Sequence, residues 1–336
     1  MTVPETMTAA VYDRFGPPET VRLETVPVPT LRAGDVLIRV HASTVSIADY
    51  RARTRDVPRG LKLLSATGTG LRRPRHPILG MDAAGDVIAV GAGVTAFAPG
   101  DRVIALAGDA FGAHAEYLRI AADGPIARIP PSMSYEDAVA VVFGGYTAHG
   151  FFKNITMGLG ATVLVNGASG AVGTAAVQLA AHQGAQVTAV TSGKNAGLVT
   201  SLGARDIIDY TQTDFMETGR TWDVIVDGVG NAPFTRVESA ISPGGALLLV
   251  SVDLAGILRL RGQSRRSGKL VTMNVGTTDA ADLDHLVALA ESGQLRPAID
   301  STFDFADIVD AHRRVDTGRK TGSVVVRIRS DGAGGR

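Results

Sequence analysis

Cysteine is absent from this chain of 336 residues. Without cysteine there can be no disulfide, no catalytic thiolate and no zinc site that uses sulfur ligands. The chain also lacks an excess of either charge, because 33 Lys and Arg residues balance 33 Asp and Glu residues. A neutral chain has no basic field of the kind on which nucleic-acid-binding proteins depend, so we expect a small molecule as the partner and no nucleic acid.

Long apolar runs are missing as well. No stretch approaches the roughly 20 consecutive apolar residues that a membrane span requires, and residues 1–10 do not resemble a secretory signal. A cytoplasmic location is the simplest expectation. The length of the chain exceeds the size of about 250–300 residues at which a single hydrophobic core usually stops growing, which predicts two domains.

The pattern of apolar residues, glycine and proline changes near residue 128. Before it, short β-branched runs separated by Gly and Pro predict an irregular β-rich module, with strands near 36–40, 84–90 and 102–106. After it, a helix capped by Ser134 is followed by six apolar runs that alternate with helical segments, near 161–165, 186–190, 207–208, 223–226, 245–250 and 269–273. Such runs are typical of parallel strands that crossover helices bury on both faces. We therefore predict an α/β protein with a doubly wound parallel sheet.

The last part of the chain is predicted to return to the first module. Helices are expected near 279–292 and 305–317, and a closing strand at 323–328 lies outside the doubly wound set. This arrangement makes the first module discontinuous, with residues 1–128 and 277–336 in one domain and residues 129–276 in the other.

A glycine-dense turn between a predicted strand and a predicted helix is the most informative motif. Residues 163–180 read VLVNGASGAVGTAAVQLA, and Ala168, Gly170 and Gly173 occupy the three positions of a dinucleotide-binding fingerprint. Small residues there let the backbone approach a diphosphate, and the helix N-terminus offers amides and a positive dipole end. The predicted cofactor-binding set in this turn is Ala168, Ser169, Gly170, Ala171, Val172 and Gly173. The alternative is a turn that only packs the helix on the strand.

The end of the next strand indicates which dinucleotide is bound. Sites that prefer NAD usually carry an acid there, which binds the ribose 2′-hydroxyl. Here the chain reads Val190-Thr191-Ser192-Gly193-Lys194, with no acid. Ser192 and Lys194 can instead donate hydrogen bonds to a 2′-phosphate, which favours NADPH. Alternatively, Lys194 is an ordinary solvated residue.

Several spaced motifs, in order, resemble those of one family over nearly the whole chain. They are the opening residues 7–19, Gly80 to Gly85, the turn Pro99 to Val103, Gly112 to Tyr117, Asn166 to Gly173, Leu202 to Ala204 with Asp209-Tyr210, and Asp227 to Gly230. The chain resembles the zinc-free quinone oxidoreductase branch of the medium-chain dehydrogenase/reductases. The resemblance implies a Rossmann domain for the doubly wound part, a GroES-like catalytic domain for the discontinuous part, and a homodimer.

The resemblance also implies further cofactor contacts. Tyr210 would lie beside Lys194 at the 2′-phosphate. Positions after the fourth, fifth and sixth strands of the doubly wound sheet would border the nicotinamide half, and a threonine in the first long helix would lie near its ring; these residues are Gly228, Val229, Ser251, Val252, Val275, Gly276 and Thr147. Each could instead be an ordinary residue at the end of a strand.

The ligands of a catalytic zinc are missing. Zinc-dependent relatives use a Cys and a Gly-His-Glu phrase, where this chain reads Gly80-Met81-Asp82 and has no Cys. Seven histidines remain, but no two have a spacing typical of a metal site. The prediction is that no metal takes part.

Without a metal or a thiol, the plausible reaction is direct transfer of a hydride to a substrate that needs little activation. Quinones and α,β-unsaturated carbonyls qualify, because the added electrons are delocalised onto oxygen. Where related enzymes carry Asn-x-x-Asp and a nearby tyrosine, this chain has Ser46, Asp49 and Tyr50. These three are the predicted catalytic residues, with Tyr50 as a proton donor or a ligand of an enolate oxygen and Asp49 fixing the loop. Water as the proton source, with Tyr50 only packing the cavity wall, is the alternative.

Two segments rich in leucine and arginine are expected to shape substrate choice. Residues 57–75 suggest a mobile helical cover on the cleft, and residues 254–266 suggest a helix near the rim of the cofactor site or simply an exposed amphipathic helix. The leading functional hypothesis is NADPH-dependent reduction of quinones or of activated C=C bonds. The alternatives are a specialised biosynthetic reductase or cyclase, and a non-catalytic NADPH-binding sensor.

Overall fold

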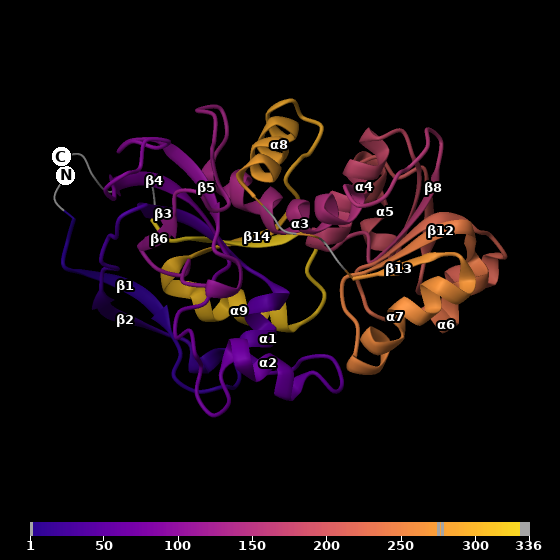
Figure 1. Ribbon diagram of the computed structural model, residues 1–336, viewed down its shortest axis with the longest axis horizontal. Coiled ribbons are helices and arrows are strands. Elements are labelled where there is room, and N and C mark those ends of the chain that lie inside the picture. Colours follow the sequence, from indigo (N-terminus) through magenta and orange to yellow (C-terminus); the bar gives the residue numbers. More distant parts are fainter. Residues whose placement is uncertain (1–2, 274–275, 277–278, 330–336) are drawn as a thin grey trace.

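The computed structural model describes residues 3–273, 276 and 279–329. Two large β-sheets lie side by side, with helices around and between them (Figure 1). Val275, one of the predicted cofactor contacts, lies outside the described residues. Among the helices of the described part of the chain, none is long and apolar enough to cross a membrane.

The first sheet has six strands, all paired in parallel. Its order is β10-β9-β8-β11-β12-β13. The strands are β8 (Thr162–Asn166), β9 (Gln186–Thr191), β10 (Asp206–Asp209), β11 (Trp222–Asp227), β12 (Ile241–Leu249) and β13 (Leu270–Thr272). Leu164, Ile225 and Leu247 in its three central strands have no exposed surface. Their burial explains why these strands are continuous apolar runs, and the predicted doubly wound sheet is confirmed.

The second sheet joins both ends of the chain. Its order is β14-β15-β3-β4-β5-β7, with β6 paired to β3. The strands are β3 (Asp35–Val45), β4 (Asp82–Val90), β5 (Arg102–Leu106), β6 (Tyr117–Ala121), β7 (Ile126–Arg128), β14 (Ile299–Asp304) and β15 (Ser323–Arg327), and a separate hairpin pairs β1 (Thr6–Val11) with β2 (Arg22–Pro27). Strand β15 runs antiparallel to β3, with Val325 opposite Thr44. The mixed α/β fold with its β-rich second module is the predicted one, whereas the domain boundaries remain a prediction.

Nine α-helices lie in the described residues. They are α1 (Ile47–Thr54), α2 (Lys62–Thr69), α3 (Tyr135–Phe152), α4 (Ala171–His182), α5 (Ala196–Ser201), α6 (Phe234–Val237), α7 (Leu254–Ser267), α8 (Ala280–Glu291) and α9 (Ile308–Asp316). Helix α3 begins where Ser134 accepts a hydrogen bond from the Asp137 amide, which is the predicted cap. Helix α2 and helix α7 lie next to each other at the lower edge of the view in Figure 1.

Helix α3 connects the two sheets through one core. Its residues pack in a single buried cluster with side chains of both sheets, including Ile104 of β5 and Val165 of β8. At Gly144, a side chain would have its Cβ only 2.1 Å from the carbonyl oxygen of Ala171, at the start of α4. Since no side chain fits there, α3 can approach the glycine turn closely and hold the two sheets in a fixed relation.

Candidate active site

The glycine-dense turn follows β8 and opens into α4, as the sequence predicts. Gly167 has a φ of 81°, a left-handed conformation that favours glycine. At Gly173, an added Cβ would lie 2.1 Å from the carbonyl oxygen of Gly167, so only glycine lets the helix pack so closely on the turn. Gly170 is the N-cap of α4. The turn therefore places unpaired amides and the positive end of a helix dipole at the carboxyl edge of the sheet.

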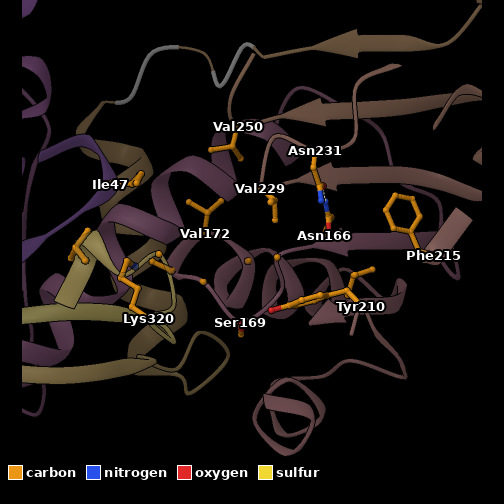
Figure 2. A pocket seen from close by; sticks show the side chains of 18 of the residues that line it. Ile47, Asn166, Ser169, Val172, Tyr210, Phe215, Val229, Asn231, Val250 and Lys320 are labelled. Atoms are coloured by element: carbon orange, nitrogen blue, oxygen red, sulfur yellow. Dashed lines mark hydrogen bonds between the residues drawn. The ribbon is translucent and has the colours of Figure 1, made fainter. Parts of the chain in front are cut away.

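A cavity of about 650 Å³ lies over this turn and reaches the second sheet. Figure 2 shows Val172, Val229 and Val250 facing it from the first sheet and its helices, with Ile47 and Lys320 on the side of the second sheet. Its lining is Ile47, Arg51, Phe143, Asn166, Gly167, Ser169, Gly170, Ala171, Val172, Gly173, Val190, Tyr210, Asp214, Phe215, Gly228, Val229, Asn231, Arg236, Val250, Val315, Gly318 and Lys320. A hollow at the carboxyl ends of parallel strands, between two modules, is where α/β proteins of this type bind ligands.

Part of the predicted cofactor set lies in this lining and part lies around it. Eight of the predicted residues line the cavity, namely Ser169, Gly170, Ala171, Val172, Gly173, Tyr210, Gly228 and Val229. Ala168 is completely buried beneath the turn. Thr147 lies on α3 and donates a hydrogen bond to the carbonyl oxygen of Phe143, which itself lines the cavity. Ser192, Lys194, Ser251, Val252 and Gly276 are not among the lining residues.

A buried carboxylate shapes the loop after β11. Asp227 has no exposed surface, and it accepts hydrogen bonds from the amides of Val229, Gly230 and Ala232 at 2.9 to 3.0 Å. The amide group of Asn166 donates to Asp227 at 2.9 Å and to the Asn231 side chain at 2.6 Å. The ends of β8 and β11 are thereby held together. Neither Asn166 nor Asn231 is among the predicted site residues, although Asn166 begins the glycine-rich motif.

A cation, Lys194, and an acid, Asp209, lie near the glycine turn on the side of β9 and β10. Tyr210 is 63% exposed and points its hydroxyl group toward the turn (Figure 2), and Lys194 is exposed nearby. The Asp209 carboxylate lies against Gly193, where an added Cβ would be 2.6 Å from its Oδ2 atom. Hydrogen bonds from the Thr211 amide and hydroxyl hold the pKa of Asp209 below its usual value. The predicted absence of an acid holds for β9 itself, whereas this acid comes from the neighbouring strand.

Lys320 reaches the same turn from the loop before β15. The amide of Gly322 donates to the carbonyl oxygen of Ser169 at 2.8 Å, and the hydroxyl of Thr321 donates to the Asn195 side chain at 3.3 Å. Burial lowers the pKa of Lys320 to about 8, although nearby Asp300 acts in the opposite direction. Sequence reasoning missed Lys320, because more than a hundred residues separate it from the turn.

The other end of the cavity is formed by α1. Ile47 and Arg51, one turn apart, line the cavity, and the Nη2 atom of Arg51 donates to the Oγ atom of Ser251 at 3.0 Å. Val252 follows Ser251 in the loop after β12, at the end of the cavity where the resemblance expected the nicotinamide.

The three predicted catalytic residues are not in the cavity lining. Ser46 and Asp49 form a capping box at the start of α1, in which the Ser46 amide and hydroxyl donate to Asp49 Oδ2 at 2.7 and 2.6 Å. Asp49 Oδ1 accepts from the Gly80 amide. Tyr50 donates its hydroxyl to Asp56 at 2.7 Å, and this hydrogen bond raises the pKa of Tyr50. These contacts give Ser46 and Asp49 structural roles and direct the Tyr50 hydroxyl to Asp56.

The position of the zinc phrase is occupied by a buried acid with its own partners. Asp82 has no exposed surface, and burial raises its pKa to about 7. Both of its carboxylate oxygens accept hydrogen bonds from Thr44, one from the amide and one from the hydroxyl. Over residues 3–273, 276 and 279–329, no group of three His, Cys, Asp or Glu side chains is arranged to hold a metal ion. Met81, in place of an imidazole, is a poor ligand for zinc.

Comparison with known proteins agrees with this architecture. Residues 32–131 match the family model described as an alcohol dehydrogenase GroES-like domain, and residues 202–326 match the model described as a zinc-binding dehydrogenase. The quinone oxidoreductase from Coxiella burnetii superposes with a TM-score of 0.84 at 27% identity, over 96% of this chain and 100% of that one. A mycobacterial protein solved with NADPH superposes with a TM-score of 0.77 at 25% identity, over 96% and 100%.

The curated relatives extend the similarity over almost the whole sequence. The 2-methylene-furan-3-one reductase of Solanum lycopersicum is 30% identical over 338 residues, which cover 97% of this chain and 80% of that protein. The human quinone oxidoreductase is 26% identical, over 95% of this chain and 97% of its own length. The chain therefore belongs to the quinone oxidoreductase-like branch of the medium-chain dehydrogenase/reductase family.

Proposed function

We propose that this protein is an NADPH-dependent reductase that acts on quinones or on the C=C bond of α,β-unsaturated carbonyls, without a metal. The observation that carries the proposal is one continuous cavity, which is lined by the glycine turn at Gly170 and by the apolar side chains of Ile47 and Val250. Such a cavity offers a diphosphate site at one end and room for a flat, apolar acceptor at the other.

The residues around the cavity suit NADPH along its length. Ser169 to Gly173 would hold the diphosphate through backbone amides and the helix N-terminus. Gly228, Val229, Ser251 and Val252 would border the nicotinamide ribose, and Gly276 and Thr147 would lie toward its ring. NADPH supplies a hydride to the electrophilic carbon of the acceptor. The protein contributes the orientation of both partners and the exclusion of water from an apolar wall.

The preference for NADPH over NADH rests on a balance of charges near the adenosine ribose. Ser192, Lys194 and Tyr210 would contact the 2′-phosphate, and Lys320 adds a cation beside the same turn. The Asp209 carboxylate opposes a phosphate, but its charge is engaged by the amide and hydroxyl groups of Thr211. Two cations, Lys194 and Lys320, and two neutral donors, Ser192 and Tyr210, stand against the engaged Asp209, while Asp214 of the cavity lining is paired with Arg236. This balance favours the phosphorylated cofactor.

The donor set at the former zinc position supports chemistry without a metal. Asp49 and Asp82 direct their oxygens to backbone and hydroxyl donors, the chain has no thiolate, and the nearby imidazole of His114 is hydrogen-bonded to the carbonyl oxygen of Thr44. A substrate for this site must therefore be electrophilic already. The names of two relatives, a quinone oxidoreductase and a 2-methylene-furan-3-one reductase, agree with such substrates.

Water is the most suitable proton source for the reduced product. Arg51, the ionisable side chain that α1 contributes to the cavity lining, holds its proton too tightly to act as an acid at neutral pH. Tyr50 is engaged with Asp56. The cavity opens to solvent, so water can protonate the reduced substrate after the hydride has been transferred.

Two measurements test this function. Purified protein should oxidise NADPH in the presence of 9,10-phenanthrenequinone or a small enone, at the same rate before and after treatment with a chelator. The Michaelis constant should be lower for NADPH than for NADH. Tight binding of NADPH with no turnover of either acceptor would favour the sensor instead, and a rate restored by added zinc would contradict the metal-free proposal.

A further inference from the structure

Arg51 is a half-buried cation in an apolar part of the cavity. Its neighbours in the lining include Ile47 and Val250, and burial lowers the pKa of its guanidinium group. Its hydrogen bond to the Ser251 hydroxyl engages one of five possible donors. Within the part of the chain that the structure describes, no carboxylate forms an ion pair with it. A guanidinium with free donors that faces a cavity is suited to bind an anion.

The phosphates of a dinucleotide do not account for Arg51. The diphosphate site lies at the glycine turn after β8, whereas the partner of Arg51 follows β12. These two strands are separated by β11 in the sheet, a spacing of about 10 Å. Lys194 and Lys320 already stand beside the glycine turn and its neighbouring loop. Arg51 is therefore placed for a group on the second ligand of the cavity.

Two segments that follow Arg51 and Ser251 in the chain carry positive charge as well, although neither is in the cavity lining. Residues 57–75 and 254–266 contain nine Lys and Arg residues and no acid, in a chain that is neutral as a whole. The two segments meet where the amide of Leu254 donates to the carbonyl oxygen of Arg59 at 3.0 Å. In the described residues, all nine of these cations are exposed and none is in an ion pair. A group of exposed charges of one sign attracts ligands of the opposite sign.

We infer that the substrate carries a negatively charged group, and that Arg51 binds this group while the electrophilic part lies against the apolar wall. The inference rests on the proposed reductase function and narrows its substrate class to anionic quinones or enones, such as those with a carboxylate, sulfonate or phosphate substituent. The exposed cations of residues 57–75 and 254–266 attract the substrate from solution, and Arg51 orients it.

A pair of quinones that differ by one charge tests this inference. The value of kcat/KM with NADPH is measured for 1,2-naphthoquinone-4-sulfonate and for neutral 1,2-naphthoquinone, and the ratio is compared between variants so that electronic differences cancel. In Arg51→Met the ratio should fall by about tenfold or more, the size expected for losing a hydrogen bond to a charged group. Arg51→Lys should recover part of it, because it keeps the charge.

Arg205→Met is the matched control. Arg205 is exposed and donates a hydrogen bond to the Gln186 side chain. Both residues lie at the amino ends of β9 and β10, whereas the cavity lies at the carboxyl ends of the parallel strands. This variant should leave the ratio unchanged. Added salt should lower kcat/KM for the sulfonate more than for the neutral quinone. If Arg51→Met leaves the ratio of kcat/KM for the two quinones unchanged, the inference is overturned. It is also overturned if an increase in the Kd for NADPH accounts for the whole loss of kcat/KM.

A binding measurement separates this inference from the proposed function. Calorimetry with 1-naphthalenesulfonate, which cannot be reduced by a hydride, is carried out on protein saturated with NADPH. The wild type should bind it at least tenfold more tightly than Arg51→Met does, and equal affinities would contradict the role of Arg51. If neither quinone is reduced but this difference is found, the proposed function fails while the anion site stands.

Discussion

Arg53 and Asp316 form an ion pair that ties α1 to α9 across 263 positions of sequence. The Nη2 atom of Arg53 lies 2.6 and 2.7 Å from the two carboxylate oxygens of Asp316, and the Arg53 side chain is completely buried. Helix α1 presents Ile47 and Arg51 to the cavity, and the segment after α9 presents Lys320. This ion pair therefore helps to set the positions of α1 and of the segment after α9, which both line the cavity.

Removing the charge of Asp316 should destabilise the protein substantially. Asp316→Asn leaves the buried Arg53 without an anion, and we expect the free energy of unfolding to fall by about 3 kcal/mol. Denaturant unfolding measures this loss. The control is Asp206→Asn, since the exposed pair of Asp206 with Arg220 should contribute under about 1 kcal/mol. Equal losses in the two variants would show that burial of Arg53 has no energetic consequence.

A methyl group at Gly173 should disturb the diphosphate site. In Gly173→Ala the new Cβ meets the carbonyl oxygen of Gly167, so α4 must move away from the turn, at a cost of about 1–3 kcal/mol in stability. The Kd for NADPH in calorimetry should rise at least tenfold. Gly197→Ala in α5 is the control, because its Cβ would meet open space. Unchanged affinity in Gly173→Ala would argue against a cofactor held by this turn.

Lys320 should make cofactor binding sensitive to pH near 8. Burial holds its pKa at about 8, below the ordinary value of about 10.4, so the amine is charged below pH 8 and becomes neutral above it. Since only the charged form attracts phosphate, the affinity for NADPH should fall between pH 7 and pH 9. The free energy of unfolding without cofactor should rise slightly from pH 8 to pH 10, where the unfolded chain binds more protons. In Lys320→Met the decline in affinity over this range should be much smaller, and an identical pH profile would exclude Lys320.

Tyr50 should be dispensable for the reduction. Its hydroxyl donates to Asp56 and the residue lies outside the cavity lining, so Tyr50→Phe should keep kcat within about twofold. Steady-state rates with 9,10-phenanthrenequinone, and solvent isotope effects in both variants, provide the measurement. A loss of tenfold or more in kcat, together with a changed isotope effect, would identify Tyr50 as the proton donor.

The sequence alone determined the features that depend on neighbours along the chain. The glycine turn at residues 167–173 follows from local backbone geometry, because a left-handed φ at Gly167 and close packing at Gly173 require glycine. The parallel sheet follows from continuous apolar runs, and the missing zinc ligands follow from composition. The absence of an acid at the end of β9 was equally visible.

Only the tertiary structure decided which distant side chains meet at the cavity. Arg51 rather than its neighbour Tyr50 lines it, because consecutive residues of a helix differ by about 100° in direction and the orientation of α1 depends on its packing against α9. Lys320 comes from the loop before β15 and Asp209 from the end of β10, through contacts that no local pattern encodes. Consecutive residues determine the local backbone conformation, whereas a site between two sheets depends on how those sheets pack against each other.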